Sequence, residues 1–247
     1  MRSLMLLFVV SLAAQTPPTK GDATAILTGA RAALGGEKRI AAVKTLIANG
    51  RTRQVRGDNL VPIEFEIQIE LPDKYSRRDE FPAQDSGPAT NGFSADRLVQ
   101  IPKPAAALPE AAAASRLATA KQDFARLMLG LFASSYSGFP LTFTYLAQAE
   151  APQGKADVLD VKGPSNFAAR FFVHSETRMP IMVSWETKGP SSQVEQRLYF
   201  ADYRDVDGLQ LPFRIRRAAG TDTSEETTFD RFRVNARIDP RRFEVAN

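Results

Sequence analysis

The feature that most constrains the fold is an alternation of apolar and polar side chains along positions 61–71. Ile63, Phe65, Ile67 and Ile69 alternate there with three glutamates and one glutamine. Neighbouring side chains on a β-strand point to opposite faces of the sheet, so this strand has one apolar and one acidic face. The pattern predicts an antiparallel sheet with one face buried and the other face in water.

The same alternation, less regular, recurs along the C-terminal half of the chain. Turn signals rich in Gly, Pro, Asn and Asp separate the segments that carry it, which favours short hairpins. Short turns indicate an up-and-down meander in place of βαβ units. The predicted strands are 45–55, 61–71, 74–81, 93–101, 141–149, 158–162, 167–174, 181–187, 196–203, 209–217 and 227–234.

Two segments predict helices. Residues 22–43 form one, with Asp22 as N-cap and an interruption at Gly35 and Gly36. The stronger helix covers 110–132, which is rich in good helix formers. Its apolar stripe either packs on the sheet as core or borders a ligand cavity, and the sequence leaves both alternatives open. The stripe consists of Leu117, Ala120, Phe124, Leu127, Met128 and Leu131.

A sheet of about eleven strands curls, and its apolar face becomes concave if the long helix lies inside it. The expected fold class is mainly β (α+β): a strongly curved antiparallel half-barrel with two or three helices covering the concave face. A half-barrel with so few helices leaves apolar surface unfilled, which is a physical route to a lipid site. We expect 15–247 to form a single domain, with 82–92 a loop and 102–109 a stiff, proline-rich connector.

The first residues predict export. Arg2 precedes an apolar run at 4–12, and small residues follow it, so we expect a signal peptide at 1–14. An anchor that is never cut is the alternative. The chain has no cysteine, which excludes disulfides and thiolate metal sites. The net charge of +4 comes from arginines scattered among carboxylates, which argues against nucleic acid as a partner.

The sequence carries no convincing catalytic constellation. His174 is the only histidine, and no ligand spacing supports a metal site. A Ser-His-Asp hydrolase stays formally open, but no Gly-x-Ser-x-Gly elbow occurs. Glu64, Glu66 and Glu70 fall on the wet face of their strand, where charges are expected. We therefore expect no enzyme activity, no cofactor and no metal.

Several motifs resemble the LolA/LolB-like superfamily, in particular its outer-membrane lipoprotein-sorting-like members. The N-terminal part carries Ala-Leu-Gly-Gly at 33–36 before Val-Lys-Thr-Leu at 43–46. The last third is more similar: the turn Thr-Arg-Met-Pro at 177–180, the hairpin at 200–213 and the ending at 234–243.

The resemblance implies an incomplete, curved barrel closed by helices around an apolar cavity. In the carrier members this cavity takes lipoprotein acyl chains in transit through the periplasm. This chain differs in having the additional region 82–109, and no segment matches a carrier's functional residues.

We therefore expect a periplasmic, monomeric, non-enzymatic protein that binds or carries the acyl chain of a lipid or lipoprotein. The alternative is an envelope sensor or protein-interaction domain with the same fold and a filled core, which recognises a protein through an edge strand or the loop 82–92. The predicted cavity residues are Ile63, Phe65, Ile67, Ile69, Phe124, Leu127, Met128, Leu131, Phe171, Val183, Trp185 and Phe213.

Overall fold

The protein is built on one antiparallel sheet, seen here in a computed structural model that describes residues 21–82, 87–151, 154–189 and 192–244. The predicted signal peptide 1–14 lies outside these residues. The helices are α1 (Ala23–Ala33), α2 (Glu37–Ala41), α3 (Glu110–Phe132) and the 3-10 turn η1 (Pro240–Phe243). The strands are β1 (Thr45–Arg56), β2 (Asn59–Glu70), β3 (Lys74–Glu80), β4 (Ala89–Ser94), β5 (Arg97–Ile101), β6 (Thr142–Ala151), β7 (Gly154–Gly163), β8 (Phe167–His174), β9 (Pro180–Lys188), β10 (Gln193–Val206), β11 (Leu209–Ala219) and β12 (Asp222–Val234).

The strand order confirms the predicted meander. It runs β5-β4-β3-β2-β1-β12-β11-β10-β9-β8-β7-β6. Strands that are consecutive in the sequence are therefore neighbours in the sheet, except β5 and β6. One neighbouring pair is not consecutive in the sequence: β1 pairs with β12 in antiparallel orientation, which joins the first and last strands in the middle of the sheet. Strands β5 and β6 form its two edges, so the sheet is open.

One strand more is present than the eleven expected, because 93–101 is not a single strand. It contains the last two residues of β4 and all of β5, joined by the two-residue turn Ala95-Asp96. Ala95 takes a left-handed backbone with φ of 51°, a conformation usually signalled by Gly or Asn. The expected loop 82–92 is correspondingly shorter, since 89–92 belong to β4.

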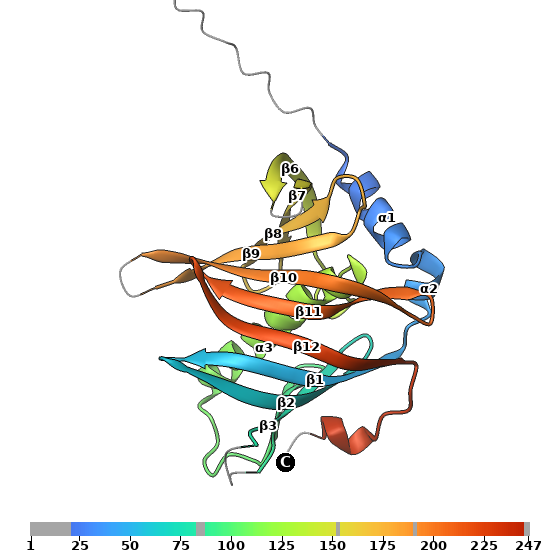
Figure 1. Cartoon of the computed structure of the whole chain (residues 1–247). Coiled ribbons are helices and arrows are strands. Elements are labelled where there is room, and N and C mark those ends of the chain that lie inside the picture. The colour runs from blue at the N-terminus through green and yellow to red at the C-terminus, as the bar shows by residue number, and fades with distance from the viewer. Residues whose placement is uncertain (1–20, 83–86, 152–153, 190–191, 245–247) are drawn as a thin grey trace, which may run out of the picture.

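Helix α3 shows how strongly the sheet curves. It contacts β4 and β5 near one edge and also β9 and β11 in the other half, so the sheet wraps around it. Figure 1 shows α3 behind the sheet, with α1 alongside one end of it. Burial of the inward side chains of β2 and β11 confirms the predicted apolar face.

Close packing fixes α3 against β10. A methyl carbon at Gly130 would overlap Cε1 of Phe200, a core ring that is 1% exposed. Beside this contact the Tyr203 hydroxyl donates to the Gly130 carbonyl at 3.0 Å and also lies 3.2 Å from the Pro180 carbonyl. Gly130 therefore lets the helix approach the sheet at ring-to-backbone distance.

The N-terminal helical region forms as predicted. Asp22 caps α1 by accepting a hydrogen bond from the Thr24 amide at 2.9 Å. Gly35 and Gly36 adopt φ angles of +119° and +94°, so the chain leaves α1 and enters α2 through backbone that favours glycine.

The outer face of the sheet is only partly in water, which corrects the expectation for β2. Gln68 is 7% exposed because the segment after β12 folds back over this face. Ile47 packs there with Ile238 and Phe243. The return is anchored by Asn235, whose side-chain oxygen accepts from the Lys44 amide at 2.7 Å.

The Gly130–Phe200 contact predicts opposite outcomes for two matched substitutions. Gly130→Ala should destabilise the protein by about 1–3 kcal/mol, because overpacking exceeds the gain in helix propensity of about 1 kcal/mol. Gly29→Ala, in α1, meets only the flexible Arg178 side chain at 3.4 Å and should stabilise by about 0.5–1 kcal/mol. Urea unfolding of both variants measures this. Stabilisation by both would show that α3 does not press on Phe200.

Candidate functional site

The structure places the twelve predicted cavity residues together in the interior. Leu127 is partly buried, and the others are at most 8% exposed. They come from β2, α3, β8, β9 and β11, and all but Ile63 belong to one main hydrophobic cluster or pack against it. Sequence periodicity thus identified inward positions. Whether a ligand reaches them stays a prediction.

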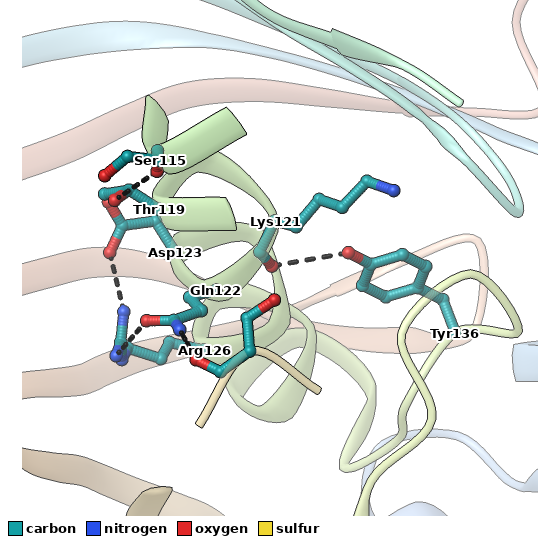
Figure 2. Close-up of polar contacts among 8 residues, drawn as sticks. Ser115, Thr119, Lys121, Gln122, Asp123, Arg126 and Tyr136 are labelled. Carbon is teal, nitrogen blue, oxygen red and sulfur yellow. Dashed lines mark hydrogen bonds and ion pairs between the residues drawn. The ribbon is translucent and has the colours of Figure 1, made fainter. Parts of the chain in front are cut away.

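Aromatic rings fill the interior below the C-terminal half of α3. Phe124 lies 5.5 Å from Phe93 and 4.8 Å from Tyr136, measured between ring centroids. Tyr136 continues to Phe139 at 5.9 Å, and Phe139 to Phe167 at 5.5 Å. The Tyr136 hydroxyl donates to the Lys121 carbonyl at 3.3 Å, as Figure 2 shows, and burial raises its pKa.

The N-terminal half of α3 is packed differently and borders a cavity of about 470 Å³, called here the apolar groove. Its walls are β5, the connector 102–109 and the first two turns of α3. The lining is mainly apolar, with charged and polar side chains among it: Asp96, Arg97, Leu98, Gln100, Lys103, Pro104, Ala106, Ala107, Leu108, Glu110, Ala113, Ala114 and Leu117.

The composition of α3 explains the groove. All eight of its buried residues lie between Phe124 and Phe132, whereas the first half is rich in alanine. Alanine favours the helix but is too short to fill the space beneath it. Leu117 lines the groove and also packs against the main core, so the groove borders the core at this side chain.

An ion pair connects α3 to the β4–β5 turn, which forms part of the groove. Lys121 Nζ on α3 lies 2.5 Å from the Asp96 carboxylate in the β4–β5 turn. The hydrogen bond and charge of Lys121 lower the pKa of Asp96. Sequence reasoning singled out Leu117 from this site but missed the other groove residues. The alanine run and the proline-rich connector were the available signals.

A second, smaller cavity of about 300 Å³ lies at the other end of α3. It is lined by Met128 and Phe132 from the helix, by Ile40 and Val43 near α2, and by Leu71 among others. Met128 is one of the predicted cavity residues. Apolar cavities therefore flank both ends of the packed interior.

His174 has a structural place in the turn after β8. Its Nδ1 accepts from the amides of Glu176 and Thr177 at 3.1 and 3.2 Å. Among the described residues no group of three or more His, Asp or Glu is arranged to hold a metal ion. None of the helices in that part of the chain has the length and apolarity needed to cross a membrane.

Comparison with known proteins shows the fold. No family model matches the chain, and no curated protein matches it. The structure of a LolA superfamily protein from Nitrosomonas europaea is similar, with a TM-score of 0.58 and 13% identity over 90% of this chain and 97% of that one. A structure described as an outer membrane lipoprotein-sorting protein domain from Vibrio parahaemolyticus gives 0.56 and 12% over the same shares. The chain therefore has a LolA-like fold.

The buried aromatic interior predicts a loss of stability in alkali. Burial raises the pKa of Tyr75 to about 12, against about 10 in the unfolded chain. The unfolded state then loses its proton first, so stability is fully present below about pH 10 and falls as the pH rises towards 12.

From about pH 8 to pH 11 the free energy of unfolding should fall by about 1 kcal/mol less in Tyr75→Phe than in the unsubstituted protein. Urea unfolding at both pH values measures this difference. The pH 8 data serve as the internal control. An equal loss in both proteins would contradict burial of this hydroxyl.

Proposed function

We propose that this protein is a non-enzymatic, periplasmic binding or carrier protein for the acyl chain of a lipid or lipoprotein. The apolar groove carries the proposal, because it is open to solvent, mainly apolar, and next to the core at Leu117. The LolA-like fold supports the class, since one similar structure is described as an outer membrane lipoprotein-sorting domain. That description also supports an envelope location.

The size and lining of the groove suit an acyl chain. Its volume of about 470 Å³ lies within the range of about 300–1,000 Å³ typical of small-ligand sites. Each buried methylene contributes about 0.8 kcal/mol, so ten of them offset much of the cost of association without a specific polar contact. The charged side chains of both signs in the lining would keep a polar head group out of the apolar part of the groove.

We further propose that a longer chain continues into the interior lined by the twelve predicted residues. Leu117 provides the route, and the cavity beside Met128 offers space at the far end of α3. Entry requires the aromatic rings around Phe124 to shift, because they are in contact in the present structure.

A filled interior also favours the alternative, an envelope sensor or protein-interaction domain. In that case the edge strand β5 would contact the partner, since its outer side has no neighbouring strand in the described sheet. Lipid binding and protein recognition differ in one measurable respect: only the first needs the groove to be empty.

Groove binding predicts a selective effect of a bulky side chain. Delipidated protein should bind a fluorescent fatty acid saturably, and Ala114→Trp, which fills the groove, should weaken binding at least about tenfold through steric overlap. Ala111→Trp is the matched control, because Ala111 is exposed on the same helix but outside the lining. Equal binding by both variants would place the ligand elsewhere.

Penetration into the interior predicts quenching of Trp185, the only tryptophan in the chain. An acyl chain brominated near its methyl end should quench Trp185 fluorescence, whereas the unbrominated chain should not. Saturable binding without quenching would leave the groove as the site and contradict the interior as its extension.

A further inference from the structure

The sheet splits between β8 and β9. Their ladder ends at the pair Arg170–Ser184, although both strands continue beyond it. From there β8 stays paired with β7 back to Phe167, and β9 stays paired with β10 as far as Lys188. A cavity of about 290 Å³, called here the polar slot, lies at this split. It is lined by Gln122, Arg126, Asp160, Asn166, Ala168, Ala169, Arg170, Ser184, Trp185, Glu186 and Glu195.

A buried arginine of α3 lies in the slot. Arg126 is 6% exposed, and its guanidinium carbon lies 4.2 Å from the ring centroid of Trp185 and 5.1 Å from that of Phe167. One ring belongs to β9 and the other to β8, so the cation contacts both sides of the split. Such stacking suits the planar guanidinium.

Side chains of α3 supply the acceptors for the two terminal nitrogens of this guanidinium, as Figure 2 shows. Nη1 donates to Asp123 at 2.9 Å, and Nη2 donates to the side-chain oxygen of Gln122 at 3.4 Å. Gln122 in turn donates to the carbonyl of Ser165, in the β7–β8 turn, at 2.9 Å. These bonds orient Arg126 from the helix side.

The third nitrogen of this guanidinium has an unsatisfied N–H. Nε of Arg126 is buried and has no acceptor among the described residues. An unsatisfied buried donor on a charged group is costly, so the slot favours a ligand that brings an oxygen. Burial also lowers the pKa of Arg126.

Charges at the rim narrow the ligand class. Asp160 is paired with Lys162, and Glu195 with Arg197, so each of these carboxylates has a cation of its own strand beside it; Asp160 is also the cross-strand neighbour of Arg170. Arg170 and Glu186 remain as one exposed cation and one exposed anion on opposite strands of the split. A ligand with a single negative charge would satisfy Arg126 and Arg170 but face Glu186.

We propose that the polar slot binds a small zwitterion of the free amino acid class. Its carboxylate accepts from Nε of Arg126 and from Arg170, and its ammonium group lies towards Glu186. The site is separate from the apolar groove, because Arg126 follows Leu117 by nine residues, two and a half helical turns, and so lies on the opposite side of α3. Binding of an acyl chain in the apolar groove and binding of a zwitterion in the polar slot can therefore succeed or fail independently.

Trp185 is the only tryptophan and stacks on Arg126, so its fluorescence reports on the slot. Glycine, sodium acetate and methylammonium chloride are titrated separately at constant ionic strength, with sodium chloride as the blank. We expect a saturable change with glycine, a higher half-saturation concentration with acetate, and no saturable change with methylammonium. The absence of a saturable glycine response, or equal half-saturation by acetate, would overturn the proposal.

Three substitutions locate the response. Arg126→Gln should abolish it, and Arg170→Gln, at the exposed rim, should raise the glycine half-saturation concentration about three- to tenfold. Glu186→Gln should weaken glycine without weakening acetate. Arg116→Gln, exposed on α3 and outside the slot, is the matched control and should change nothing. If Arg126→Gln fails to fold, the two rim variants still decide, since a glycine response unchanged in both would contradict the assignment.

Discussion

The fold depends on burying one continuous apolar sheet face against the C-terminal half of α3. The decisive contact is Gly130 on Phe200, where the absence of a side chain lets the helix reach the sheet. Tyr203 then bonds the Gly130 carbonyl and lies close to the Pro180 carbonyl, linking α3 with β10 and β9. Because this contact holds the helix inside the concavity, the sheet can remain open at β5 and β6 without exposing its core.

The unequal packing of α3 produces the two features with functional interest. Its C-terminal half is fixed by aromatic contacts such as Phe124 with Tyr136. Its alanine-rich N-terminal half lines the apolar groove and packs against the core with Leu117 and Ala120. On the opposite side, Arg126 is held between Trp185 and Phe167 at the split of the sheet. One helix thus lies between the mainly apolar groove and the polar slot.

Local patterns predicted most of the architecture. Alternation along β2 and β11 identified the buried face, and Asp22 marked the start of α1 correctly. The β4–β5 hairpin was missed because Ala95 adopts a left-handed turn without the usual glycine. Gln68 was expected in water, but it is buried next to Ile47, on which Phe243 packs from a segment far later in the chain. Such coverage has no local signal, because it depends on where the chain returns.

The sequence by itself determined the strands, the helices, the inward positions and the meander, because these follow from periodicity and turn chemistry between near neighbours. Only the tertiary structure decided where cavities form. The groove arises because short alanines of α3 face the 102–109 connector, and the polar slot arises because β8 and β9 follow different partners beyond Arg170. Arg126 looks in the sequence like an ordinary surface charge of a helix. Only the tertiary structure buries it, because packing of α3 on the sheet brings its guanidinium to Phe167 of β8 and Trp185 of β9.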